Sequence, residues 1–375
     1  MAATTVLSAV VCTPCVPRVG WVALSDGIIQ DVGTGRPSWR AIDLGDRILT
    51  PGLIDLQING IGDIDFASAG SEDWLHACTS LTSRGVTSFC PTVVSAPLSA
   101  YDGMLTSIAA AQREAEARPS SPTIVGAHLE GPFLGGAPGA HRPELLQTAD
   151  VDWLVRLVDA HPGVVRIVTI SPEADPGFAA IQWLHEAGAV VALGHSEATY
   201  DVVIAAADAG ASLVTHLFNG MSPLHHREPG MTGAALDDDR LTPTLIADLV
   251  HVHAAALRLA IARKPNIALV SDVVASPHAS PPGSPQPDAI RLPDGRLAGA
   301  TALLDRAVAN VISLGIPIER AIAMASTVPA AVLGLTDRGC LVAGARADVV
   351  AFDATTMAVR DVWVGGDQIV VGDPI

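Results

Sequence analysis

Four polar residues follow short apolar runs of the chain, and their types would together suit metal-assisted hydrolysis. Glu130, His195, His216 and Asp272 each stand at the end of a different run. One carboxylate and two imidazoles make a three-ligand catalytic metal site that leaves a position for water. Such donors suit Zn²⁺ best, with Fe, Co or Mn as the other candidates. Asp272 is then available as a general base, which predicts hydrolysis of an amide or ester.

Each of these residues also has a structural interpretation. A single histidine at a strand end is more often a hydrogen-bonded packing residue than a metal ligand. Two on neighbouring strands, with a glutamate before them and an aspartate after, are harder to explain by packing. Each charged group at such a position loses hydration free energy unless it is paired or bound to a metal. The four residues together therefore favour a metal site.

The central part of the chain predicts the elements that position these residues. Short apolar runs alternate with helical stretches such as Glu72–Arg84 and Tyr200–Ala209, which is typical of repeated strand–helix units on a parallel sheet. We expect a closed (β/α)₈ TIM-like barrel of class α/β, whose chemistry collects at the carboxyl ends of the strands. An open doubly wound sheet is the alternative, but no G-x-G-x-x-G loop follows the first run. The expected strands are Leu53–Leu56, Thr87–Cys90, Thr123–His128, Val165–Ile170, Ala189–Leu193, Ser212–Thr215, Thr244–Ala247 and Asn266–Val270.

The two ends of the chain read as short β-strands separated by turns. Neither end has enough apolar residues for a core of its own, so we expect them to pair into one small domain. The predicted division is residues 1–50 with 336–375 as a small β-sandwich domain, and residues 51–335 as the catalytic barrel. The expected strands are Thr5–Val11, Trp21–Leu24, Gly27–Val32, Ala347–Phe352, Val359–Val364 and Gln368–Val371.

Composition narrows the class of protein. Of 375 residues, 49% are hydrophobic and 16% charged, which excludes disorder as the dominant state. The formal net charge of −17 disfavours nucleic acid and anionic membranes as partners. An anionic small molecule would need a local cluster of Arg, His or main-chain N–H groups. The acidic balance therefore restricts an anionic small substrate to a locally positive site.

The cysteines and the N-terminal segment predict a soluble, cytoplasmic protein. The five cysteines are too few and uneven in number for a disulfide framework. We interpret Cys12-x-x-Cys15 as part of an N-terminal strand, because no second pair or nearby histidine completes a zinc or redox site. No basic residue precedes Arg18, so a signal peptide is not expected, and no apolar stretch is long enough to span a membrane.

Several long motifs resemble the amidohydrolase superfamily and, within it, the family of N-acetylglucosamine-6-phosphate deacetylases. They occur in order over nearly the whole chain, which makes the resemblance specific. The weaker Gly344-to-Val350 segment is common to the superfamily. The matching segments are Pro51 to Gly60, His128 to Phe133, Gly194 to Thr199, Thr215 to Met221, Arg227 to Gly230, His251-Val252 and Ser271-Asp272.

The resemblance implies one catalytic metal, held by Glu130, His195 and His216, with Asp272 as the base. The superfamily's usual His-x-His on the first strand is replaced here by Gln57-x-Asn59. Its usual bridging carboxylated lysine has no counterpart, because the only lysine, Lys264, precedes the eighth strand. Both differences favour one metal over two.

The resemblance further implies deacetylation of a phosphorylated N-acetyl amino sugar, giving glucosamine 6-phosphate and acetate. It assigns His251 to polarisation of the substrate carbonyl and implies a homodimer in which some phosphate contacts come from the neighbouring subunit. His225 and His226 either add positive charge beside Arg227 or occupy a solvated loop. The substrate contacts that it implies are His141, Asn219, Gly220, Arg227 and His251.

Some residues depart from the family pattern and leave the substrate open. Leu249 stands where the family has glycine, and we expect it to narrow the pocket. Val273 and Val274 follow the base where smaller or polar residues are usual. The alternatives are another N-acyl amino sugar, a cyclic amide, or a non-catalytic scaffold that keeps only the barrel. The scaffold is disfavoured because all four chemical residues are present.

Overall fold

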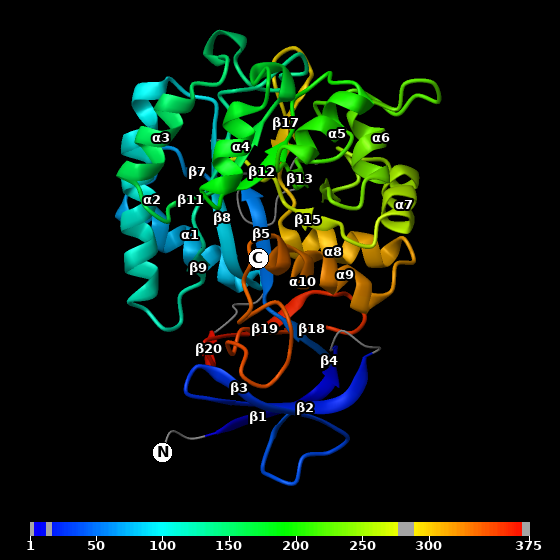
Figure 1. Ribbon diagram of the computed structural model, residues 1–375. Coiled ribbons are helices and arrows are strands. Elements are labelled where there is room, and N and C mark those ends of the chain that lie inside the picture. The colour runs from blue at the N-terminus through cyan, green and yellow to red at the C-terminus, as the bar shows by residue number, and fades with distance from the viewer. Residues whose placement is uncertain (1–3, 13–16, 277–288, 370–375) are drawn as a thin grey trace.

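In the computed structural model, the larger part of the protein is built around eight parallel strands, each hydrogen-bonded to the next of these eight in chain order (Figure 1). The structure describes residues 4–12, 17–276 and 289–369. The strands and their helices form the predicted TIM-like barrel, nearly closed. The strands are β5 (Leu53–Ile58), β8 (Val86–Val94), β10 (Ala127–Glu130), β11 (Val165–Ile170), β12 (Val190–Leu193), β13 (Leu213–Val214), β14 (Thr242–Ile246) and β15 (Ala268–Val270).

Helices cover the outside of this barrel. Acidic residues in the first turn favour the start of α1, where the Asp73 carboxylate accepts the N–H of Gly70 at 2.8 Å. At α3, Asp150 caps the first turn by accepting the N–H of Trp153 at 2.9 Å. The helices are α1 (Ser71–Ser83), α2 (Tyr101–Glu116), α3 (Val151–Ala160), α4 (Ala179–Glu186), α5 (Tyr200–Asp208), α6 (Gly230–Asp237), α7 (Ala254–Arg263), α8 (Leu304–Ser313), α9 (Ile318–Ala325) and α10 (Thr327–Val332).

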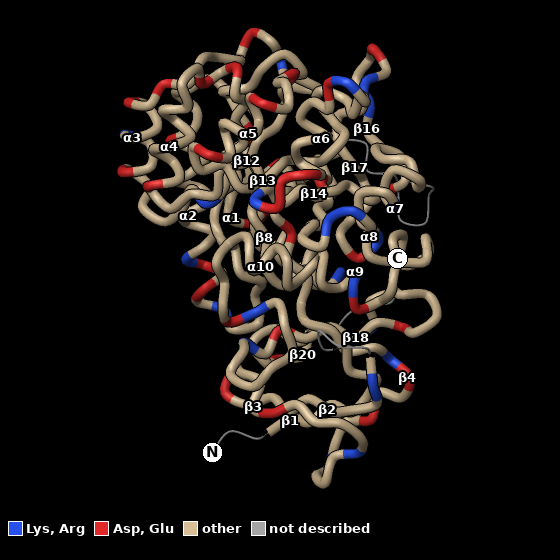
Figure 2. The backbone as a smooth tube through the Cα atoms, turned by 45° about the vertical axis from the view of Figure 1, so that its right-hand side comes forward, with Lys and Arg blue, Asp and Glu red and all other residues tan. Residues whose placement is uncertain are grey.

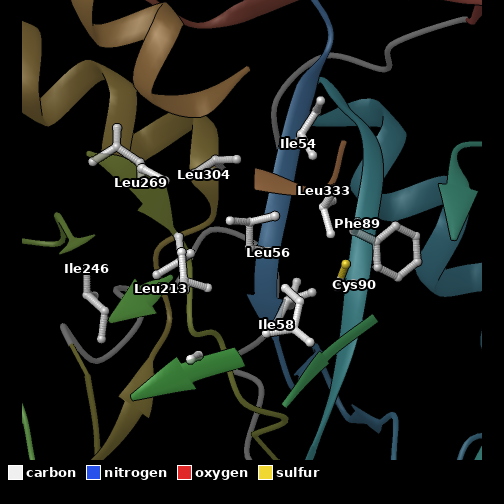
Figure 3. Packing of buried hydrophobic residues seen from close by; sticks show 14 of the residues in the cluster. Ile54, Leu56, Ile58, Phe89, Cys90, Leu213, Ile246, Leu269, Leu304 and Leu333 are labelled. Carbon is white, nitrogen blue, oxygen red and sulfur yellow. The ribbon is translucent and has the colours of Figure 1, made fainter. Parts of the chain in front are cut away.

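Alternation along β5 separates packing residues from polar ones. Figure 3 shows Ile54, Leu56 and Ile58 in a hydrophobic cluster that also contains Leu304 of α8 and Leu333 after α10. Because side chains alternate between the two faces of a strand, the intervening positions 55, 57 and 59 face the opposite side. The first strand therefore contributes both to the core and to the polar mouth of the barrel.

The first and last barrel strands meet at a seam bridged by a buried carboxylate. Oδ1 of Asp55 accepts the N–H of Ser271 at 3.2 Å and that of Gln57 at 3.2 Å. Next to it, the N–H of Asp272 donates to the main-chain oxygen of Gln57 at 2.9 Å. Asp55 thus takes the place of a main-chain acceptor where the ladder is incomplete.

Strands from both ends of the chain form one seven-stranded sheet below the barrel (Figure 1). Its order is β20-β19-β18-β4-β1-β2-β3, so the central contacts join β4 and β18, which are far apart in sequence. A separate buried cluster, including Leu7, Leu49 and Trp363, packs within it. We propose the division into residues 1–50 with 336–375 and residues 51–335, which the separate sheet and this cluster support. The strands are β1 (Thr5–Val11), β2 (Arg18–Ser25), β3 (Ile28–Thr34), β4 (Ile42–Pro51), β18 (Val349–Phe352), β19 (Val359–Val364) and β20 (Asp367–Ile369).

Three details differ from the sequence-based expectations. The run Thr123–His128 is divided between β9 (Thr123–Ile124) and β10, because the chain turns at Gly126 with φ +144°. A Cβ at Gly126 would lie 2.5 Å from the oxygen of Val164, so glycine is required there. Strand β4 and four short additional strands were not expected. The additional strands are β6 (Gly60–Ile61) with β7 (Ile64–Asp65), and the hairpin β16 (Ala289–Arg291) with β17 (Leu297–Ala300).

Charged residues of both signs are distributed along the chain, with acidic residues both in the barrel and in the small sheet (Figure 2). No helix within the described residues combines the length and the apolar character needed to cross a bilayer. Of the motif Cys12-x-x-Cys15, Cys12 is buried directly after β1, and Cys15 lies outside the described residues.

Asp55→Asn should remove one component of the pH dependence of stability. Burial raises the pKa of the Asp55 carboxyl to about 6 from its ordinary value of 3.8. The folded protein therefore binds this proton at a higher pH than the unfolded chain, so acidification from pH 7 to pH 5 stabilises the wild type through Asp55 by about 1 kcal/mol.

Urea unfolding of both proteins at pH 7 and pH 5 measures this difference. The free energy of unfolding of the wild type should change by about 1 kcal/mol more in the stabilising direction than that of Asp55→Asn. An identical pH dependence in the two proteins would contradict a charge buried at the seam.

Candidate metal centre

The ends of four barrel strands bring the predicted metal ligands and the predicted general base together. Glu130 is the last residue of β10, and His195, His216 and Asp272 follow β12, β13 and β15 within two residues. The last three have φ values of +50°, +33° and +50°. This left-handed conformation costs about 1–3 kcal/mol for a residue other than glycine and is typical of functional sites. It turns the chain at each strand end.

The ligand atoms of Glu130, His195 and His216 converge. Oε1 of Glu130 lies 3.1 Å from Nε2 of His195 and 3.0 Å from Nε2 of His216, and the two Nε2 atoms are 3.2 Å apart. Nδ1 of His195 faces the carbonyl of Ala137 at 3.1 Å, and Nδ1 of His216 faces that of Asn219 at 3.2 Å. Because a carbonyl only accepts, each Nδ1 carries a proton, and Nε2 of each neutral ring carries a lone pair.

This arrangement fits a small divalent cation. In the neutral rings no proton separates the three electron-pair donors, which therefore repel one another unless a positive charge lies between them. A tetrahedral ion with bonds of about 2.0–2.1 Å separates its ligand atoms by about 3.3 Å, close to the distances found here. Burial lowers the pKa of His216, yet its hydrogen bond to Glu130 and the charge of that carboxylate raise it overall. The cluster thus attracts positive charge, and its three buried residues could hold a metal ion.

Asp272 lies beside this cluster with its carboxylate buried. Oδ1 accepts an N–H from the Asn59 amide at 2.9 Å and one from the Gln57 amide at 3.2 Å. Burial, and then the negative charge of Glu130, raise the pKa of Asp272 to about 7. A pKa near neutrality suits a group that accepts and returns a proton. A cation at the neighbouring cluster lowers this pKa and favours the ionised form.

His251 is oriented by a neighbouring carboxylate. Its Nδ1 lies 2.6 Å from Oδ2 of Asp248, while Oδ1 of Asp248 accepts the main-chain N–H groups of Val250 and His251. Burial opposes the ionisation of Asp248, but the hydrogen bonds from His251 keep its pKa below the usual value. Nδ1 of His251 is therefore the protonated nitrogen, and Nε2 remains available to a substrate.

His141 presents the opposite nitrogen. The main-chain N–H of Ser95 donates to its Nδ1 at 3.4 Å, and the Ser95 hydroxyl lies 2.9 Å from the same atom. Burial lowers the pKa of His141 to about 4, so the ring is neutral near pH 7 and carries its proton on Nε2. That nitrogen lies 3.8 Å from Oε2 of Glu130.

Asn219 and Gly220 support the two ligand histidines. The carbonyl of Asn219 faces His216, and its side-chain amide donates to the oxygen of His216 at 3.3 Å. Gly220 has φ +57°, and a Cβ there would lie 2.9 Å from Nδ1 of His195. Only glycine lets the chain pass so close to the ring of His195.

A cavity of about 540 Å³ joins these residues. His141, Asn219, Gly220, His251 and Asp272 all line it together with the three candidate ligands. The structure thus brings together all the predicted site residues except one.

The exception is Arg227. It is exposed and lines a separate hollow of about 640 Å³ with Tyr200, Glu228 and Arg263. One guanidinium nitrogen of Arg227 lies 2.9 Å from Nε2 of His226, which is also exposed. Within one chain, the cluster around Arg227 therefore does not border the candidate metal centre.

Sequence reasoning missed two arginines that line the metal-site cavity, Arg142 and Arg296. Arg296 donates to Oδ2 of Asp294 at 2.8 Å and to the carbonyl of Gly139, which joins the β16–β17 hairpin to the loop after β10. The dipeptide Asp294-Gly295 is a turn signal that could have predicted the hairpin itself, but not its contact with the loop after β10.

The prediction that Leu249 narrows the pocket is wrong. Leu249 adopts φ +68° in the tight turn between Asp248 and His251, is 40% exposed, and is not among the residues that line the cavity. Val274 does line the cavity, whereas Val273 is buried. Of these three residues that depart from the family pattern, Val274 is therefore the one that can contact a molecule bound in the cavity.

Comparison with known proteins gives the chain a family. Residues 48–369 match the amidohydrolase family. The chain is 35% identical to N-acetylglucosamine-6-phosphate deacetylase of Danio rerio, covering 88% of this chain and 86% of that protein. It is 37% identical to N-acetylgalactosamine-6-phosphate deacetylase of Escherichia coli O157:H7, covering 92% and 95%.

A solved structure agrees with these sequence relatives. A mutant N-acetyl-D-glucosamine-6-phosphate deacetylase from Mycobacterium smegmatis, in complex with N-acetyl-D-glucosamine-6-phosphate, superposes with a TM-score of 0.90. The two sequences are 33% identical, and the superposition covers 98% of this chain and 100% of that one. By its fold, its sequence and its cluster of potential metal ligands, the chain belongs to the amidohydrolase family.

Proposed function

We propose that this protein hydrolyses the N-acetyl group of N-acetylglucosamine 6-phosphate, giving glucosamine 6-phosphate and acetate. The observation that carries the proposal is the convergence of Glu130, His195 and His216 next to the buried carboxylate of Asp272 in one cavity. Relatives that cover most of the chain bear the names of sugar-phosphate deacetylases, which supports the substrate class. The low cysteine content supports a cytoplasmic location.

In this proposal Glu130, His195 and His216 would hold one divalent ion, for which Zn²⁺ is the best match to two imidazoles and one carboxylate. When bound, such an ion supplies Lewis-acid chemistry, lowering the pKa of water and polarising a carbonyl oxygen. The carbonyls of Ala137 and Asn219 hold the two rings in the orientation that this requires.

Two side chains carry out proton transfer and stabilise the developing charge. Asp272 accepts a proton from the water that attacks the acetamide carbon, and returns it to the nitrogen as the C–N bond breaks. This leaves acetate and the free amine. His251, anchored through Nδ1 by Asp248, donates from Nε2 to the carbonyl oxygen when it carries a second proton, and so stabilises the developing negative charge.

The phosphate of the substrate requires positive charge that the protein as a whole lacks. Arg142 and Arg296 line the cavity from the same chain. We propose that Arg227 serves the cavity of the partner subunit in a homodimer, because it is exposed and borders a different hollow in its own chain. A guanidinium matches a phosphate through paired hydrogen bonds.

Asp272→Asn tests the proposed base. The substitution keeps the shape and can accept hydrogen bonds, but it removes the group that takes the proton. We expect kcat for acetate release to fall by about 10²- to 10⁴-fold. Metal content, measured by elemental analysis, should remain near that of the wild type, since Asp272 is not one of the three ligands. Loss of the metal in this variant would make Asp272 a ligand and contradict its role as base.

The sugar itself has a second candidate, N-acetylgalactosamine 6-phosphate, because one relative at 37% identity bears that substrate in its name. We expect higher kcat/KM for N-acetylglucosamine 6-phosphate than for its galacto epimer, and lower kcat/KM for either sugar without phosphate. Coupled acetate assays on these four compounds measure the order. A preference for the galacto epimer would replace the proposed sugar, and equal kcat/KM with and without phosphate would remove the phosphate site.

Mixing two inactive variants tests the shared site. Arg227→Ala should lower kcat/KM for the phosphorylated sugar, corresponding to an increase of about 2–4 kcal/mol in the activation free energy. If Arg227 acts in the partner subunit, a hybrid dimer of Arg227→Ala with Asp272→Asn contains one complete site. An equimolar, randomly exchanged mixture should then recover about a quarter of the wild-type activity. Recovery of no more than the average of the two variants would place Arg227 in its own subunit's site or outside any site.

A further inference from the structure

Two side-chain amides on β5 and just after it hold the proposed base. Gln57 and Asn59 are 1% and 8% exposed. The amide nitrogen of Asn59 donates to Oδ1 of Asp272 at 2.9 Å, and that of Gln57 donates to the same oxygen at 3.2 Å. The Gln57 amide nitrogen also donates to Oε1 of Glu130 at 3.0 Å. It therefore lies between two carboxylates that repel each other.

The amide oxygens indicate why these side chains are oriented in this way. Oε1 of Gln57 and Oδ1 of Asn59 are buried and have no hydrogen-bond partner among the residues that the structure describes. An unpaired buried acceptor costs free energy. Turning either amide over would place its oxygen against a carboxylate oxygen, which can only accept. The carboxylates of Asp272 and Glu130 therefore fix the orientation of the two amides, and the amide oxygens of Gln57 and Asn59 are left without hydrogen bonds.

The main chain around Asp272 is held independently of these amides. Its N–H donates to the oxygen of Gln57 at 2.9 Å, and its own oxygen accepts the N–H of Ala300 at 3.0 Å. Truncating the side chain of Asn59 or Gln57 leaves both of these contacts in place. The contribution of the amides can therefore be measured separately from that of the turn.

We propose that Asn59 and Gln57 are positioning residues that aim Asp272 at the substrate. By occupying Oδ1, they leave Oδ2 as the oxygen that takes the proton of the attacking water, and the Gln57 amide reduces the repulsion between Asp272 and Glu130. The inference rests on the proposed function and adds to it the residues that make a single carboxylate oxygen the base. Asn59 is the cleaner member of the pair, because its side chain donates to Asp272 and not to a metal ligand.

A double-mutant cycle tests this assignment. Asn59→Ala should lower kcat by about 10- to 100-fold, with KM changed less than about 3-fold and metal content unchanged. In the Asp272→Asn background the same substitution should change kcat less than about 3-fold, because the group it acts through is already gone. Equal losses in the two backgrounds, or a loss confined to KM, would overturn the proposal.

Two further variants control for folding and volume. Asn59→Asp keeps the size of the side chain but opposes Asp272 with a second carboxylate, so it should lower kcat at least as much as Asn59→Ala. Gln112→Ala removes a comparable amide on α2, which donates to the oxygen of Ile124 at 3.2 Å, and should leave kcat unchanged. Full activity of a folded Asn59→Asp protein would overturn the proposal.

A crystal structure of Asn59→Ala separates this inference from the proposed function. We expect the Asp272 carboxylate to rotate or to occupy more than one conformation once its shortest hydrogen bond is removed. A single, unchanged conformation would overturn the positioning role even if the protein deacetylates the proposed sugar. The other outcome is a displaced Asp272 carboxylate in Asn59→Ala together with a wild-type protein that releases no acetate. That result would support the positioning of Asp272 by Asn59 but would refute the proposed deacetylation.

Discussion

One carboxylate oxygen and two imidazole nitrogens approach one another within about 3 Å, each offering an electron pair, and the rest of the site depends on relieving their repulsion. A proton or a cation between them would do so. The protein fixes the electron pairs by committing the opposite nitrogen of each ring to a main-chain carbonyl. Gly220 then lets the chain close over His195. These outer contacts make the cluster suited to a metal, because they turn Nε2 of both rings towards Glu130.

The same requirement explains the charges around the cluster. Glu130 and Asp272 are both buried near one another, and each makes ionisation of the other less favourable. The amides of Gln57 and Asn59 offset that repulsion, and a cation held by the three ligands would reduce it further. The chain as a whole is acidic, so positive charge near the mouth comes from individual arginines. An anionic substrate is therefore recognised locally and not by the overall field of the protein.

Much of this architecture follows from short-range patterns in the sequence. Buried parallel strands are nearly continuous apolar runs, so Val165–Ile170 was predicted with its bounds and most other barrel strands within a few residues. Strand β4 was missed because polar residues such as Asp43 and Asp46 interrupt it, and its partners β1 and β18 come from opposite ends of the chain. Pairing between such distant segments leaves no local signal.

Some residues of the candidate site could likewise be predicted from the sequence, and others could not. Glu130, His195, His216 and Asp272 could be found because a parallel barrel places the residues after its strands around one mouth. Arg296 could not be placed from its sequence neighbours alone, since its position depends on a hairpin folding over the loop that contains Gly139. Arg227 stands in a motif with the expected spacing, yet it borders a different hollow in its own chain. Contacts between loops that are far apart in the sequence require the three-dimensional arrangement.

Metal analysis of protein purified without added metal, combined with an assay of acetate release from N-acetylglucosamine 6-phosphate, tests the central claim most directly. The account predicts about one divalent ion per chain, loss of acetate release when a chelator removes it, and recovery when the ion is restored. Acetate release that persists at full rate in metal-free protein would contradict it. So would an ion that stays bound after Glu130, His195 and His216 are all replaced by alanine.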